Sequence, residues 1–151
     1  MRFPTLIAAA VLSISAACAP AAAGPGESPA PGSGSAATAQ RTWEARRPAA
    51  YAYDLAISCF CIHRGEYTVE VRNGSVASAR ERASGAAADA SRMALIPSVD
   101  RLFEMINEAS RNGRPLRVEY DAQRGYPREA EIGLLADDSG TLYTIENLRA
   151  L

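Results

Sequence analysis

The chain has 151 residues, a length typical of one domain, and its composition is 48% hydrophobic and 22% charged. Its 16 basic residues are all arginine, and together with 17 acidic residues they leave a formal net charge of −1, which offers no general attraction to nucleic acid. The lack of lysine excludes Schiff-base chemistry and a Walker-type phosphate loop, because both need a primary amine.

Residues 1–17 have the features of a bacterial export signal: a basic start, an apolar stretch and small residues at its end. The motif Ser15-Ala16-Ala17-Cys18 resembles a lipobox, in which the cysteine is acylated and becomes the mature N-terminus. We therefore expect a lipid on Cys18 that anchors the protein in the cell envelope, and Ala19 favours an outer membrane facing the periplasm. The alternative is ordinary cleavage after Ala23, which would release a soluble secreted protein.

Residues 18–41 are mostly Ala, Pro, Gly and Ser. Such a segment cannot bury enough apolar surface to offset the entropy lost on ordering, so we expect a flexible tether. The folded domain is then predicted at 42–151, long enough for one modest core.

The first half of this domain predicts three strands. After a short helical turn at 43–47, apolar residues occupy every second position from Tyr51 to Cys61, which indicates a half-buried strand. A second alternating run at 66–72 ends at Asn73-Gly74, a turn that favours a hairpin, and a return strand should begin at Val76.

Residues 83–96 have no clear period and predict a mobile connection. A helix should follow, capped by Ser98 and stopped by Asn112-Gly113. Its apolar stripe, which includes Leu102, Phe103 and Ile106, is expected to pack on a sheet, with a partner-binding face as the alternative.

Three further strands are predicted at 116–121, 130–134 and 142–148. Neighbouring strands joined by tight turns must be antiparallel. The predicted fold is therefore α+β, a single antiparallel sheet of about five to six strands with one principal helix packed on one face.

Several features of this domain occur together in one family: Cys59-Phe60-Cys61, the strands around Asn73-Gly74, the Leu102-Phe103 helix, and Tyr120-Asp121 followed by Gly125-Tyr126-Pro127. In these features residues 43–148 resemble an uncharacterised domain-of-unknown-function family of small bacterial secreted proteins and lipoproteins. The resemblance implies an envelope location and a single small α+β domain. The resemblance does not identify any catalytic residue in this chain.

The cysteines are the most reactive feature of the sequence. If lipid occupies Cys18, then Cys59 and Cys61 remain as a pair in an oxidising compartment, and a disulfide is the main expectation. In a flat strand their Cα atoms would be about 6.6 Å apart, so bonding requires a bend. A redox-labile pair and free buried thiols are the alternatives.

His63 adds a metal-site hypothesis. Cys59, Cys61 and His63 alternate, so an extended strand would direct two thiolates and an imidazole to one side, as a Cu(I) or Zn(II) site requires. Zinc usually takes four ligands and Arg64 opposes a cation, so a turn or surface role for His63 is the favoured interpretation.

The segment from Tyr120 to Pro127 has two interpretations. Asp121 near the hydroxyls of Tyr120 and Tyr126 could bind a polar ligand or act in acid–base chemistry. The favoured one is a hairpin in which Asp121 caps the connection, Gly125 supplies a permissive φ and Pro127 starts the next strand.

Two functional hypotheses follow. The first is a non-catalytic lipoprotein, expected to be a monomer without cofactor, that contacts an unknown envelope protein; the pattern predicts no enzyme. The second is a thiol-based redox or metal-handling module centred on Cys59, Cys61 and His63.

Overall fold

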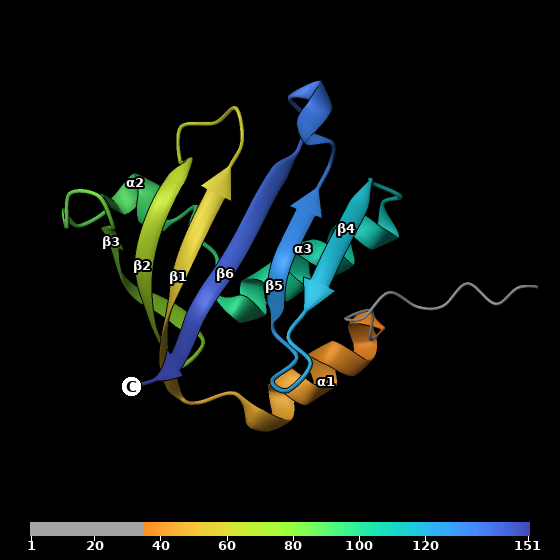
Figure 1. The fold of residues 1–151 in the computed structure, drawn as a ribbon, viewed down its shortest axis with the longest axis horizontal. Helices are drawn as coiled ribbons and strands as arrows, with labels where there is room; N and C mark the ends of the chain where they lie inside the picture. Colours follow the sequence, from red (N-terminus) through yellow and green to blue (C-terminus); the bar gives the residue numbers. More distant parts are fainter. Residues whose placement is uncertain (1–34) are drawn as a thin grey trace, which may run out of the picture.

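Six antiparallel strands form one open sheet in the computed structural model, which describes residues 35–151 (Figure 1). Their order across the sheet is β3-β2-β1-β6-β5-β4. Their bounds are β1 Ala50–Ser58, β2 Gly65–Arg72, β3 Ser75–Glu81, β4 Leu116–Tyr120, β5 Pro127–Ile132 and β6 Thr141–Ala150. The predicted export signal, Cys18 and most of the predicted tether lie outside the described residues.

Two three-stranded meanders make up this sheet. β1 to β3 and β4 to β6 each follow one another along the chain, and the pairing of β1 with β6 joins them, with Leu55 opposite Ile145. Because all pairings are antiparallel and the helices cover one face, the α+β prediction is confirmed.

Helix α3 (Val99–Arg111) connects the two meanders and has the predicted ends. Ser98 caps it by accepting a hydrogen bond from the backbone N–H of Arg101, and Gly113 follows with φ +63°. Its apolar stripe is buried, so the interpretation as a core face is correct. None of the described helices is long and apolar enough to cross a membrane.

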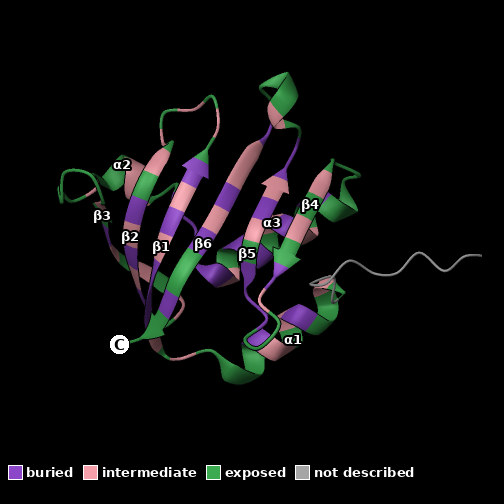
Figure 2. Cartoon of the chain, viewed as in Figure 1, coloured by how far each residue is buried: buried purple, intermediate pink, exposed green. Residues whose placement is uncertain are grey.

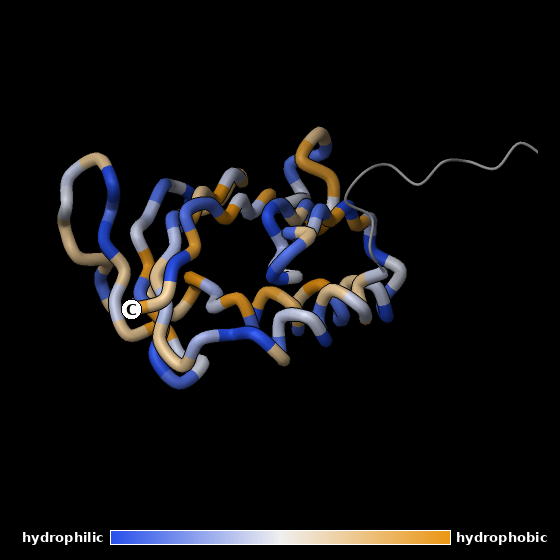
Figure 3. Tube along the Cα trace, turned by 60° about the horizontal axis from the view of Figure 1, so that its bottom comes forward, coloured by the Kyte–Doolittle hydropathy of each residue, from blue (hydrophilic) through white to orange (hydrophobic). Residues whose placement is uncertain are grey.

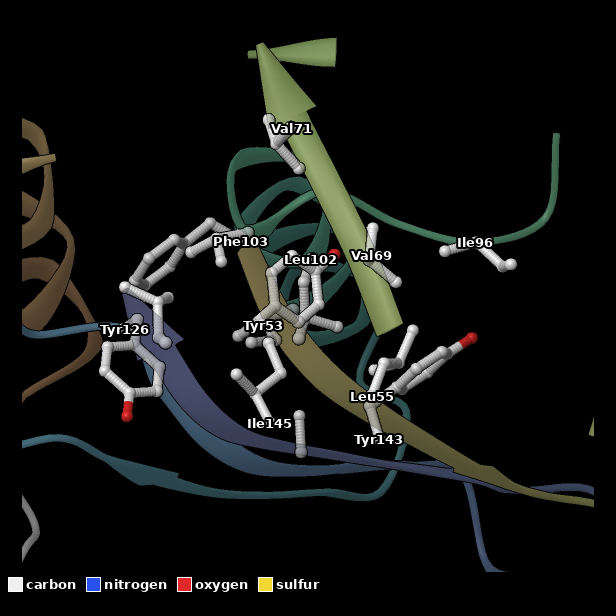
Figure 4. Packing of buried hydrophobic residues seen from close by; sticks show 14 of the residues in the cluster. Tyr53, Leu55, Val69, Val71, Ile96, Leu102, Phe103, Tyr126, Tyr143 and Ile145 are labelled. Atoms are coloured by element: carbon white, nitrogen blue, oxygen red, sulfur yellow. The ribbon is translucent and has the colours of Figure 1, made fainter. Parts of the chain in front are cut away.

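The core lies between α3 and the inner face of the sheet. In Figure 3 the helices form one layer against the sheet, and Figure 4 shows Leu102 and Phe103 among strand residues that include Tyr53 and Val69. These side chains are at most 2% exposed, and full burial of each contributes about 1.5–3 kcal/mol. The outer face is polar, and in Figure 2 the strands alternate between buried and more exposed positions.

Helix α1 (Ala36–Arg46) is longer than the turn predicted at 43–47, and it begins before the predicted domain boundary at residue 42. Ser35 caps it by accepting a hydrogen bond from Thr38 N. The sequence did not indicate this helix because only Ala39 and Trp43 are buried, which is too few for an apolar stripe.

The predicted connection after β3 contains regular structure. Residues 86–88 return along β3, where Glu81 N donates to Ala86 O, and α2 (Ala90–Met93) follows. Asp89 caps α2 by accepting from Arg92 N. A helix of four residues is too short for a repeating apolar pattern, so the sequence does not indicate it.

Candidate functional site

The two cysteines lie in the loop between β1 and β2, at one end of the sheet (Figure 1). The expected strand from Tyr51 to Cys61 ends at Ser58, so the prediction that Cys59 and Cys61 continue the strand is wrong. Residues 59–63 form bends and a turn instead. One signal in the sequence indicated this end of the strand. Phe60 and Ile62 are apolar, yet they fall at positions where a longer β1 would place its outward-facing side chains.

Bending of this loop brings the cysteines together. The Sγ atoms of Cys59 and Cys61 are at bonding distance, and their Cα atoms are 5.2 Å apart, within the range that a disulfide requires. In a flat strand the Cα separation would be about 6.6 Å. The bend that the sequence analysis required for this pair is therefore present.

His63 completes a compact group of three ligand types. Its Nε2 lies 3.6 Å from the Sγ of Cys61, and the ligand atoms of Cys59, Cys61 and His63 all lie within 4.8 Å of one another. The backbone of His63 is held from β2, because the hydroxyl of Tyr67 donates to the His63 carbonyl oxygen across 3.2 Å. All three side chains are half-buried, so solvent reaches them.

Phe60 and Ile62, which alternate with these ligands along the loop, project into solvent. They are 79% and 81% exposed, the highest values among the large hydrophobic residues of the described chain. Leu134, 44% exposed, lies in the connection between β5 and β6 at the same end of the sheet, next to the 3₁₀ helix η1 (Leu135–Asp137). Two loops therefore present apolar side chains at this end, which we call the loop end of the sheet.

The opposite end of the sheet carries the segment from Tyr120 to Pro127, where the structure has the hairpin. Asp121 Oδ1 accepts hydrogen bonds from the backbone N–H groups of Gln123 and Arg124, at 3.0 and 2.7 Å. Gly125 has φ +79°, and β5 begins at Pro127. The carboxylate of Asp121 thus shapes the connection, as the favoured interpretation expects.

The tyrosines of this hairpin pack into the core. Tyr120 stacks on Phe103 with ring centroids 6.0 Å apart, and Tyr126 meets Trp43 edge-on at 6.3 Å. Burial raises the pKa of both phenols, so they stay protonated at neutral pH. The proposed acid–base use of this segment gains no support from this packing.

A second polar group, which the sequence did not indicate, lies where α1 meets α3. Asp100 accepts a hydrogen bond from Trp43 Nε1 and forms an ion pair with Arg47. A cavity of about 300 Å³ adjoins it, lined also by Tyr51 and Asn73. The charges within this group compensate one another, which indicates a structural role.

Asp54 lies on the outer face of the sheet, in the middle of β1. Partial burial raises its pKa, but hydrogen bonds from Asn147 Nδ2 and Thr68 Oγ1, each 2.9 Å long, outweigh this effect and lower the pKa. The residue therefore links three neighbouring strands as a carboxylate.

Comparison with known proteins places the chain in a family. The sequence profile of a family of unknown function, DUF6174, matches residues 35–150. The chain belongs to the DUF6174 family. Its match begins at the residue that caps α1, which agrees with α1 as part of the DUF6174 domain. No curated protein and no solved structure matches the chain.

Proposed function

We propose that this DUF6174 protein is a non-catalytic interaction module of the bacterial cell envelope. A lipid on Cys18 anchors it, and the loop end of the sheet contacts an envelope protein. The observation that carries the proposal is the exposure of Phe60 and Ile62, at 79% and 81%, on a loop that is tied down at both sides.

The loop is suited to binding because it is already ordered. The contact between Cys59 and Cys61 closes a small ring around Phe60, and Tyr67 holds the backbone at His63. Binding a preorganised loop avoids most of the entropy lost when a flexible segment is ordered. Large apolar side chains on such a loop are typical anchors for a partner's pocket.

We infer a protein partner rather than a lipid surface from the acidic residues in the other loop at this end of the sheet. Asp137 and Asp138 lie next to Leu134 in the connection between β5 and β6, and both are exposed. Anionic lipid headgroups would repel them. The partner that fits is a protein with an apolar pocket for Phe60 and Ile62 and basic groups facing the two aspartates.

Helix α1, which leads from the proposed anchor into the domain, lies away from the proposed binding loop. Arg46 of α1 donates to the carbonyl oxygen of Gln123 in the β4–β5 connection, so α1 lies at the end of the sheet opposite Phe60 (Figure 1). The described chain begins beside α1, at Ser35. An anchor that precedes α1 therefore joins the domain at the end of the sheet opposite Phe60 and Ile62.

Site-specific photocrosslinking in intact cells tests the proposal. In the full-length protein, Ile62 is replaced by photoreactive benzoylphenylalanine, with the same replacement of Leu95, 43% exposed between α2 and α3, as the control. We expect a protein adduct of one size from position 62 and none from position 95. Phe60→Ser should abolish this adduct, and Asp137→Asn with Asp138→Asn should reduce it.

Two results would contradict the proposal. One is an adduct with lipid, and the other is equal crosslinking from both positions. The melting temperature of Phe60→Ser should equal that of the wild type, because an exposed side chain contributes little to folding. Loss of the adduct can then be attributed to the binding surface.

The Cys59–Cys61 pair favours a second candidate function, thiol–disulfide exchange, because both side chains are half-buried rather than enclosed. Exchange requires a pair whose reduction potential lies near that of its partners. Equilibration with glutathione buffers measures this potential. A value above about −200 mV would support exchange, and one below about −300 mV would identify an inert disulfide.

A further inference from the structure

We propose that Cys59, Cys61 and His63 bind one Cu(I) ion when the two cysteines are in the dithiol form. This site goes beyond the interaction proposed above and uses other side chains of the loop: its three ligands are half-buried, whereas Phe60 and Ile62 extend into solvent. The observation that carries it is the clustering of two sulfurs and one imidazole nitrogen within 4.8 Å.

The separations suit a three-coordinate ion. With metal–ligand bonds of about 2.0–2.3 Å, the donor atoms of a trigonal site are about 3.5–4 Å apart. Cys61 Sγ and His63 Nε2 are already 3.6 Å apart. Reduction must move the two sulfurs apart to a similar distance, and Cα atoms 5.2 Å apart allow this by side-chain rotation.

The ligand types select the metal. Thiolates are soft donors and favour Cu(I), whereas structural zinc sites take four protein ligands. Within the described residues, the cluster offers only these three ligand atoms. The nearby carboxylate of Glu66 lies 3.3 Å from Arg82 Nη1 and is thereby engaged. A trigonal Cu(I) site is complete with two sulfurs and one nitrogen, but a structural zinc site is not.

Charge supports the same choice. Two thiolates, a neutral imidazole and Cu(I) would give the site a net charge of −1, so the positive charge of Arg64, the next residue along the chain, attracts the loaded site although it would repel a bare cation. The loop is also held in place for binding. Arg64 N donates to Cys61 O across 3.5 Å, and Tyr67 anchors His63 from β2.

Formation of the site requires a reductant. A dithiol donor transfers two electrons and two protons to the Cys59–Cys61 bond, so that the S–S bond breaks, two thiols form and the donor's own dithiol becomes a disulfide. Cu(I) then binds to both sulfurs with release of the two thiol protons. Exchange with the disulfide form of the same donor would take up two electrons, re-form the Cys59–Cys61 bond and release the ion.

The test is an anaerobic Cu(I) titration of the full chain in competition with the chromophoric chelator bicinchoninate. All samples carry Cys18→Ser, so that Cys59 and Cys61 are the only thiols. The reduced protein should bind one Cu(I) per chain, with thiolate-to-copper absorption in the near ultraviolet. Oxidised protein should bind at least about a hundredfold more weakly, because it lacks both thiolates.

Two variants separate this site from the interaction surface. His63→Ala should weaken Cu(I) binding at least about tenfold, since loss even of outer-shell partners has effects of this size. Phe60→Ser, on the same loop, should bind Cu(I) like the unsubstituted chain. In cells the pattern should reverse: His63→Ala keeps the crosslink from position 62, whereas Phe60→Ser loses it.

Three results would overturn the copper site. They are unchanged affinity in His63→Ala, equal binding by oxidised and reduced protein, and tighter binding of Zn(II) than of Cu(I) by the reduced chain. None of these results affects the crosslinking outcome, so failure of the copper site and failure of the interaction can be told apart.

Discussion

Trp43 of α1 donates its indole N–H to Asp100 in the first turn of α3, with Nε1 and Oδ1 2.9 Å apart. The same carboxylate pairs with Arg47, whose Nη1 lies 2.8 Å from Oδ2, although Oδ2 lacks an aligned hydrogen bond. Trp43 is 1% exposed and meets Tyr51 edge-on at 5.3 Å. One aromatic side chain thus fastens α1 to both the sheet and the main helix.

Replacement of this residue should show that α1 belongs to the cooperative fold. Trp43→Ala is expected to lower the free energy of unfolding by about 3–5 kcal/mol, the usual loss for a large buried aromatic side chain. Glu44→Ala, an exposed position on the same helix, should change it by less than about 0.5 kcal/mol. Urea denaturation measures both, and equal values would mean that α1 is not part of the folding unit.

Substitution of Gly125 should lower the stability of the fold by more than its positive φ alone predicts. A Cβ at this position would lie 2.2 Å from the carbonyl oxygen of Ala39, so α1 leaves room only for glycine. Gly85 provides the control, because it has φ +69° but no atom lies within 4 Å of the place that a Cβ would occupy. Gly85→Ala should cost about 1–2 kcal/mol for the left-handed conformation, and Gly125→Ala at least about 1 kcal/mol more for the clash.

Thermal and urea unfolding of the two glycine variants supply the comparison. Because the two positions share the sign of φ, the difference between them isolates the contact with α1. A Gly125→Ala variant as stable as Gly85→Ala would place α1 farther from the hairpin than the structure has it.

The sequence predicted those elements whose residues repeat with a clear period. The stripe of Leu102, Phe103 and Ile106 with its Ser98 cap located α3, and alternation located the strands, because both patterns reflect burial on one face. Helix α1 lacks such a stripe. Its stability comes from Trp43 and from partners far along the chain, such as Asp100 and Gln123, which no local pattern reveals.

The sequence predicted which residues make up the candidate site but not the conformation of the chain that brings them together. The alternation of Cys59, Cys61 and His63 correctly grouped the three residues, yet they meet in a bent loop rather than on a strand. The exposure of Phe60 and Ile62 follows from that bend. The out-of-phase apolar residues Phe60 and Ile62 mark the end of the strand, but no periodic pattern gives the shape of the loop that follows it.

Alkaline pH should destabilise the domain through its buried tyrosines. Burial raises the pKa of Tyr53 far above 10, and the negative charge of a neighbouring ionised Tyr51 would raise it further. Above pH 10 the unfolded chain therefore loses the phenol proton while the folded state retains it. The stabilising contribution is complete below pH 10 and declines as the pH rises from 10 toward the folded-state pKa.

Tyr53→Phe tests this assignment. The hydroxyl donates to the carbonyl oxygen of Pro97, so the variant should lose about 1 kcal/mol at pH 7. Between pH 10 and about 11.5 its stability should fall less steeply than that of the wild type. Urea unfolding across this range measures the slopes, and parallel curves would show that Tyr53 does not contribute to the alkaline transition.

The Cys59–Cys61 bond should contribute little to global stability despite its place next to two central strands. It closes a loop of only three residues, for which the chain-entropy model gives about 1.6 kcal/mol. Urea denaturation of the oxidised wild type, the reduced wild type and the double variant Cys59→Ser, Cys61→Ser tests this. Their free energies of unfolding should differ by no more than this amount. The double variant should also be insensitive to the reductant.

A loss of several kcal/mol on reduction would instead make the bond a structural requirement of the fold, and the dithiol form that binds Cu(I) would then be coupled to unfolding. A small loss leaves the loop free to change its redox state on an intact sheet, because the buried Leu55 and Ile57 lie in β1, outside the ring that the bond closes.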